Sequence, residues 1–242
     1  DLTDASSTIA GFIVRWEWDF GDGNTLVVNW PSNPNIQHVY ALAGTYQVDL
    51  LVTASDSCTD TETQFIDIFP TPVANFSFNT PVCFGTAVDF TDISQLNGAG
   101  SIVQWQWNFG DPASGILNTS TLPDPSHLFT LIGSFTVELV VTTGNGCSDT
   151  ITYPVVVKPQ PTVNFTTTNN CQNNAVEFDP DPLVMNVATI ADWFWEFGDG
   201  GTSVQQNATH VYVAPGMYFV TLTVTDTAGC TNSITKPVAI VA

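Results

Sequence analysis

Basic residues are almost missing from the 242-residue chain, which has three Lys plus Arg against 23 Asp plus Glu and a formal net charge of −20. Such a chain cannot neutralise a row of phosphates, which excludes ordinary nucleic-acid binding, and it lacks the basic clusters that attract proteins to anionic membranes. No run of 18 apolar residues occurs, so we expect no segment that inserts directly into a membrane. The chain begins at Asp1 with no basic segment after it, so we expect any targeting signal to lie outside this sequence.

What the chain does contain is typical of strands and turns. Its hydrophobic content of 43% is too high for a disordered acidic tail. Lys, Arg and Glu are scarce, whereas Thr, Val, Gly and Pro are plentiful, which favours β-strands over helices.

One unit occurs three times in the sequence. The motif Trp-x-Trp-x-Phe-Gly-Asp begins at Trp16, Trp105 and Trp193, with spacings of 105 − 16 = 89 and 193 − 105 = 88. A second block follows each motif and leads into a glycine and an alternating apolar run; it begins at His38, His127 and His210. Pro-x-Pro segments at 70–72 and 159–161 predict short, stiff connectors. We therefore expect domains at residues 1–70, 71–158 and 159–242.

Within each unit the apolar residues alternate with polar ones, which predicts strands with one buried face. Trp105, Trp107 and Phe109 share one face, and the polar Gln106 and Asn108 share the other. Strands separated by Gly, Pro, Asn and Asp clusters in units of this size indicate antiparallel β-sandwiches with the tryptophans in the core.

The pair of motifs W-x-W-x-F-G-D and H-x-Y-x-x-x-G-x-Y-x-V-x-L-x-V resembles the PKD (polycystic kidney disease) domain over essentially the whole chain. The resemblance implies an all-β protein of three tandem immunoglobulin-like antiparallel β-sandwich domains. Two features depart from the family pattern. The Gly-Asp-Gly turn reads Gly110-Asp111-Pro112 in the second copy, and the Asp-rich loop of many PKD domains is absent.

The five cysteines fit one disulfide in each complete unit. We expect the pairs Cys83–Cys147 and Cys171–Cys230, which in turn imply an oxidising, extracellular setting. A metal site is the alternative, but a unit offers two cysteines and one histidine without C-x-x-C spacing. Cys58 is left over, because its partner would fall near 83 − 88 = −5. The first domain is therefore predicted to lack its first strand and to belong to a longer array.

No catalytic set is present in any unit, so we predict that the chain is not an enzyme. Each unit has a single histidine in the same repeat position, which indicates a structural role in packing or bonding. The repeated Gly-Asp segments are interpreted as Asx-type turns, with calcium ligation as the alternative.

We expect no cofactor, with calcium as the one ion to consider. Hard oxygen ligands are abundant, and some PKD domains bind calcium at the edge of the sandwich. The candidate ligands are Asn75, Asp92 and Asn97. The D-x-D-x-D-G pattern is missing, and the third copy has Pro180 at the position of Asp92.

Two aromatic residues are candidates for contact with a partner. Phe194 stands between the paired tryptophans where the other copies have Glu17 and Gln106, and Trp30 lies outside the repeat pattern. One interpretation is that a loop of the same domain covers each ring. The other is that each ring meets an adjacent unit, another chain or a saccharide.

Two functional hypotheses remain from the sequence. The resemblance extends to large secreted surface proteins of Bacteroidota-type bacteria, including gliding adhesins exported by the type IX pathway. It implies a non-catalytic extracellular repeat region of a cell-surface adhesin or filament-forming protein, which acts as an extended spacer and binds a protein, a surface glycan or copies of itself. The alternative is an accessory module of a secreted hydrolase that degrades polysaccharide or protein.

Overall fold

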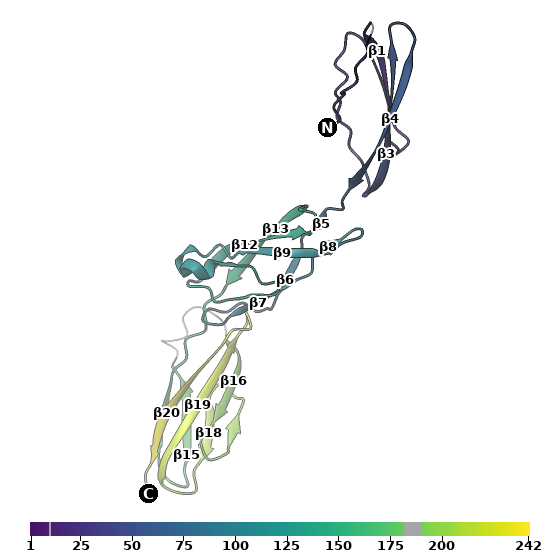
Figure 1. Ribbon diagram of the computed structural model, residues 1–242. Helices are drawn as coiled ribbons and strands as arrows, with labels where there is room; N and C mark the ends of the chain where they lie inside the picture. The colour runs from purple at the N-terminus through teal and green to yellow at the C-terminus, as the bar shows by residue number, and fades with distance from the viewer. Residues whose placement is uncertain (10, 182–189) are drawn as a thin grey trace. The chain divides into compact units, whose positions relative to one another are not determined.

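The computed structural model describes residues 1–9, 11–181 and 190–242, and its regular structure is almost entirely β (Figure 1). The prediction of an all-β chain of antiparallel sheets is confirmed. In the described part of the chain no helix is long and apolar enough to cross a membrane.

The first repeat is built on one four-stranded antiparallel sheet in the order β2-β1-β3-β4. Its strands are β1 (Ile13–Asp19), β2 (Thr25–Asn29), β3 (Gly44–Ala54) and β4 (Thr59–Ile68). Apart from this sheet, the described residues of the repeat form one isolated bridge, between Leu2 and Ile36. The core gathers Trp16, Trp18 and Phe20 against the inward side of β3.

The second repeat has the corresponding four-stranded sheet, β10-β9-β12-β13, a three-stranded sheet, β11-β7-β6, and the short pair β5-β8. Its elements are β5 (Pro72–Val73), β6 (Phe76–Phe78), β7 (Val88–Asp92), β8 (Gln95–Leu96), β9 (Ile102–Asn108), the 3-10 helix η1 (Pro112–Asn118), β10 (Thr119–Ser120), β11 (Ser126–His127), β12 (Gly133–Thr143) and β13 (Ser148–Val157). The helix η1 begins at the proline that replaces the turn glycine of the other repeats.

The third repeat pairs a four-stranded sheet, β17-β16-β19-β20, with a three-stranded sheet, β14-β15-β18. Its strands are β14 (Phe165–Thr168), β15 (Ala175–Pro180), β16 (Ile190–Glu196), β17 (Thr202–Ser203), β18 (Ala208–Val211), β19 (Gly216–Asp226) and β20 (Thr231–Ile240). Phe178 of β15 packs against Trp195 of β16, with ring centroids 5.6 Å apart, so the two sheets enclose a single core.

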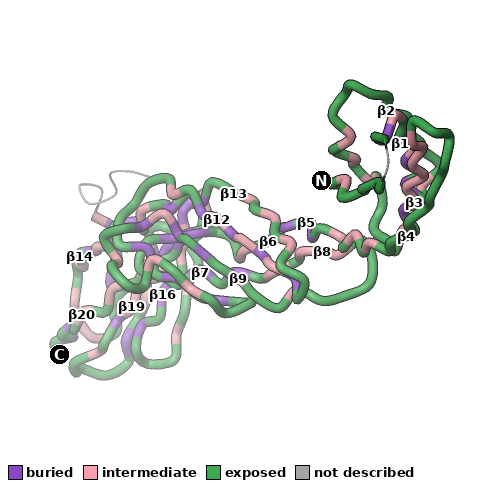
Figure 2. The backbone as a smooth tube through the Cα atoms, turned by 45° about the horizontal axis from the view of Figure 1, so that its top comes forward, coloured by how far each residue is buried: buried purple, intermediate pink, exposed green. Residues whose placement is uncertain are grey.

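Alternation along the strands separates the core from the outer face, as the sequence predicted. In β19 the buried Val220, Leu222 and Val224 alternate with the more exposed Thr221 and Thr223. Figure 2 shows buried positions interrupted by intermediate and exposed ones along the strands, and mostly exposed positions in the long loops. The turns that join the strands are therefore the segments in which polar side chains can cluster and form a site.

Candidate functional site

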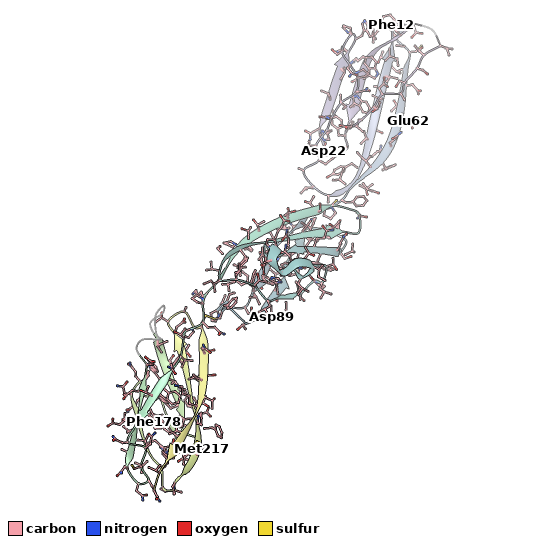
Figure 3. The ribbon with its side chains drawn as sticks, turned by 90° about the vertical axis from the view of Figure 1, so that its left-hand side faces the viewer. Phe12, Asp22, Glu62, Asp89, Phe178 and Met217 are labelled. Carbon is pink, nitrogen blue, oxygen red and sulfur yellow. A yellow bond between two sulfur atoms is a disulfide. The ribbon has the colours of Figure 1, made fainter. Side chains whose placement is uncertain are left out.

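The Gly-Asp turn after each tryptophan strand binds the histidine of the second sequence block. Figure 3 labels Asp22 at this turn in the first repeat. The distances between histidine Nε2 and aspartate Oδ2 are 2.8 Å for His38–Asp22, 3.3 Å for His127–Asp111 and 2.7 Å for His210–Asp199. The sequence predicted a structural histidine but not its aspartate partner.

Each histidine ring also lies flat on the phenylalanine that precedes the turn. The ring centroids are 3.9 Å apart for Phe20–His38, 4.3 Å for Phe109–His127 and 4.3 Å for Phe197–His210. A tyrosine closes the cluster in the third repeat, where the Tyr212 hydroxyl donates to the Phe197 carbonyl at 2.9 Å. The histidine ring is therefore engaged in packing within its own repeat, which agrees with a structural role for the histidine.

The aspartates of the first and third repeats form the predicted Asx-type turns. The Asn24 N–H donates to Asp22 Oδ1 and the Gly201 N–H donates to Asp199 Oδ1, both at 3.0 Å. The second repeat differs because Pro112 cannot form this turn. There Asp111 is buried and accepts hydrogen bonds from the Thr130 N–H at 2.9 Å and the Thr130 hydroxyl at 2.6 Å.

All three turn aspartates have a pKa below the usual range. The hydrogen bond from His38 is the main cause for Asp22. For Asp111 and Asp199 burial alone would raise the pKa, but the hydrogen bonds to these carboxylates outweigh it; they come from Thr130 and His127, and from His210 and the Gly201 N–H. The folded chain therefore holds fewer protons on these groups than the unfolded chain in mildly acid solution.

The turn aspartates should make the repeats sensitive to acid. Because their folded-state pKa is depressed, their stabilisation is full above the unfolded pKa of about 4 and is lost as pH falls through the folded pKa. The substitution Asp199→Asn should lower the stability of the third repeat by roughly 1 kcal/mol at pH 6 and reduce its pH dependence between pH 6 and 3. Calorimetry of the full chain measures both effects. The control is Asp192→Asn, an exposed carboxylate on β16; equal effects of the two substitutions would contradict the assignment.

The candidate calcium ligands take part in hydrogen bonds within the protein. Asp92 Oδ2 accepts the Trp105 indole N–H at 2.7 Å, and Asn75 Oδ1 accepts the Tyr153 hydroxyl at 3.1 Å. Asp4 accepts the Trp16 indole in the same way in the first repeat. Across the described ranges no group of three or more His, Cys, Asp or Glu side chains is placed to hold a metal ion. The set of Asn75, Asp92 and Asn97 stays a prediction.

Calcium binding by this set has a simple thermodynamic consequence. An ion that binds the folded state alone raises the melting temperature. If this set binds calcium, millimolar calcium will raise the melting temperature of the wild-type chain relative to EDTA and will have no such effect on Asp92→Asn. Magnesium serves as the control, since it requires stricter octahedral geometry. Equal melting temperatures in calcium and EDTA would remove the set from consideration.

The cysteines pair differently from the prediction. Cys83 bonds to Cys230, with Cα atoms 5.6 Å apart, while Cys58, Cys147 and Cys171 are free. The predicted pairs Cys83–Cys147 and Cys171–Cys230 are therefore wrong. The bond joins the second repeat to the third instead of closing within one repeat.

Strand length explains why the predicted pairing fails. Cys171 forms a parallel bridge with Val241, just after β20, whereas Cys230 directly precedes β20. This strand has ten residues, and at about 3.3 Å per residue its ends lie roughly 33 Å apart. Disulfides require Cα atoms within about 7 Å. Two cysteines at opposite ends of one strand cannot meet.

Both predicted contact residues are exposed to solvent. Phe194 is 42% exposed on the outer side of β16, and Trp30 is 61% exposed beyond the end of β2. The Trp30 ring meets Phe12, with centroids 5.5 Å apart. A loop of the same repeat therefore leaves much of each ring uncovered.

The sequence analysis missed two further apolar residues on the outer face of the third repeat. Met217 and Phe219 of β19 are 59% and 65% exposed, and Figure 3 labels Met217 on this strand. They pair with Ala239 and Pro237 of β20. We call Phe194, Met217 and Phe219 the apolar face. The equivalent residues are polar in both other repeats: Gln106, Ser134 and Thr136 in the second and Glu17, Thr45 and Gln47 in the first. Aligning the copies position by position would have found this difference.

Comparison with known families finds the PKD domain three times along the chain. The model of the PKD domain matches residues 3–68, 70–158 and 156–242. Among curated relatives, Collagenase ColA of Bacillus cereus is 40% identical over 57 residues, which is 24% of this chain and 6% of that protein. A microbial collagenase of Vibrio alginolyticus is 42% identical over 62 residues, 26% of this chain and 7% of that protein. The chain thus spans only a small part of these relatives.

Solved structures include single domains that resemble one repeat in sequence. The PKD1 domain of Vibrio anguillarum Epp is 30% identical, with a TM-score of 0.32 over 37% of this chain and 95% of that domain. The PKD1 domain of the Vibrio cholerae metalloprotease PrtV is 32% identical, with a TM-score of 0.31 over 36% of this chain and 98% of that domain.

Proposed function

Because the chain belongs to the PKD domain family, we propose that it is a non-catalytic extracellular repeat region of a cell-surface adhesin or filament-forming protein. In this proposal the array is a spacer that also carries an interaction surface. The observation behind it is that three repeats follow one another directly and that a disulfide joins the second to the third. A covalent bond between neighbouring domains suits a part that must hold domains in series.

An extracellular location agrees with both the family and the disulfide. PKD domains are non-catalytic modules of extracellular and secreted proteins, and collagenases are among the relatives of this chain. Disulfides persist in oxidising compartments and are rare in the cytosol of mesophiles. The net charge of −20 would keep a long array soluble by self-repulsion.

The apolar face supports the interaction part of the proposal. On a strongly acidic chain, Met217 and Phe219 stand on the outer face of β19, and Phe194 stands further along the same face opposite Thr223; the sister repeats have polar residues at all three positions. Exposed apolar groups lower solubility unless a partner covers them, and aromatic rings are enriched at contact sites. The partner we propose is a protein, a surface glycan or a second copy of the array.

The apolar face can be replaced without changing the fold, because the second repeat already has polar residues at the same positions. We expect the triple variant Phe194→Gln, Met217→Ser and Phe219→Thr to keep the melting temperature within about 2 °C. It should weaken self-association in sedimentation velocity at least tenfold, or about 1.4 kcal/mol. The control is Ile116→Gln, which removes a 92% exposed apolar residue of η1 in the second repeat. A stability loss above about 2 kcal/mol would show that these residues belong to the core.

The second candidate function is an accessory module of a secreted hydrolase, and the matches to collagenases favour it. Co-sedimentation of the chain with fibrillar collagen tests this function directly. Binding that the triple variant abolishes would support the accessory role and assign the apolar face to it. Self-association without collagen binding would favour the adhesin or filament. The domains that flank these repeats in the full-length protein also distinguish the two proposed functions. Only the accessory-module function requires a catalytic domain beside the repeats.

A further inference from the structure

The five cysteines occupy only two positions in the repeat. We call Cys83 and Cys171 the N-terminal cysteines, because each lies near the start of its repeat and forms a parallel bridge with the residue after the last strand: Lys158 for Cys83 and Val241 for Cys171. We call Cys58, Cys147 and Cys230 the hairpin cysteines, because each directly precedes the last strand of its repeat. The disulfide between Cys83 and Cys230 joins a member of each class from consecutive repeats.

The hairpin cysteines are held in the same way in all three repeats. The carbonyl of each accepts the N–H of the residue four positions earlier, at 2.8 Å for Cys58, 2.9 Å for Cys147 and 2.9 Å for Cys230. The N–H of each donates to a side-chain oxygen; the acceptors are Asp56, Thr143 and Asp226, in the same order. Each hairpin cysteine therefore has the same backbone hydrogen bond at its carbonyl, whether or not its sulfur is bonded.

The turns of the second and third repeats differ in what surrounds them, and the first turn has Ser57 in place of the glycine. Cys230 is fully buried, and a Cβ added to the preceding Gly229 would lie 3.0 Å from Pro81 of the second repeat. The equivalent Gly146 has the same left-handed backbone, with φ of 83° against 84°, but would meet nothing within 4 Å. Its neighbour Cys147 is half-buried and free. The turn at Cys147 therefore has the backbone conformation of the turn at Cys230 without a contact of the kind that Pro81 makes at Gly229.

We infer that Cys58, Cys147 and Cys171 are halves of further disulfides of the same kind, so that one disulfide crosses each joint between consecutive repeats. Cys171 takes the hairpin cysteine of a following repeat. Cys58 takes the N-terminal cysteine of a preceding repeat, and Cys147 takes that of the first repeat, which the 88-residue offset places at 83 − 88 = −5. The partner is in every case another PKD repeat of the same polypeptide. The inference concerns the covalent structure of the array and holds whichever ligand the array binds.

Bond formation needs an oxidant, which we take to be a low-molecular-weight disulfide. The thiolate of one cysteine attacks this disulfide, which forms a mixed disulfide and releases one thiol. The thiolate of the second cysteine then attacks the cysteine sulfur of the mixed disulfide and releases the second thiol. Two protein thiols lose two electrons and two protons, and the small disulfide gains them as two thiols. Oxidised glutathione serves as this reagent in vitro.

A joint can be added to the existing chain to test the inference. Val241 corresponds to Lys158, so a second copy of residues 160–242 placed after Ala242 reproduces the spacing of the joint between the second and third repeats. We expect the extended chain, after equilibration with reduced and oxidised glutathione, to contain two disulfides. These are Cys83–Cys230 and a bond from Cys171 to the appended copy of Cys230. Alkylation, pepsin digestion and mass spectrometry identify them.

The original joint is the internal control for the added one. In the variant Cys171→Ser, the appended hairpin cysteine should become fully alkylated while Cys83–Cys230 remains. The inference is overturned if both cysteines of the added joint stay alkylatable in molecules whose Cys83–Cys230 bond has formed. It is also overturned if Cys171 bonds to Cys230 of its own repeat, or if covalent dimers replace the bond within the chain. Circular dichroism and calorimetry of the variant verify that all repeats are folded.

Discussion

The burial of the Trp-x-Trp-x-Phe strand is the constraint on which each repeat depends. Trp107 and Trp195 are almost fully enclosed, and a buried indole N–H requires an acceptor. The acceptors are backbone carbonyls of the loops that follow, Leu122 at 2.9 Å and Gln205 at 2.9 Å. The strand thus fixes the path of the next loop as well as the core. In the first repeat, Trp18 Nε1 is buried with no hydrogen-bond partner among the described residues.

Much of the fold can be predicted because its signals are local and repeated. Alternation identifies the strands, and the coincidence of two motifs in three copies identifies the unit. The pairing of aspartate with histidine is less accessible, since the two are separated by 16 residues in the first two repeats and 11 in the third. The sequence does contain evidence for this pairing, because each repeat has one histidine and one Gly-Asp turn. The burial of Asp111 followed from Pro112, which removes the usual turn and directs the carboxylate to Thr130.

The cysteine pairing could not be predicted from loop length, because that measure ignores which end of the sandwich a residue occupies. A count of residues between Cys171 and Cys230 gives a plausible loop, yet the two lie at opposite ends of β20. The useful signal was topological. Cys171 pairs with the residue after the end of β20, so it cannot reach Cys230 at the beginning of the same strand. A cysteine in this position instead lies near the linker to the following repeat. The apolar face was missed for a different reason, since only a position-by-position comparison of copies reveals it.

The bond between Cys83 and Cys230 also determines how the array would carry mechanical tension. The two cysteines are 147 residues apart in sequence. A force applied to the two ends of the chain is therefore carried by the disulfide, and the residues between the two cysteines bear none of it. That shielded segment corresponds to roughly 500 Å of extended chain. Most of the second and third repeats could therefore not be unravelled by force while the bond is intact. Reduction of this single bond would expose the second and third repeats to the applied force, under which each could then unfold and extend.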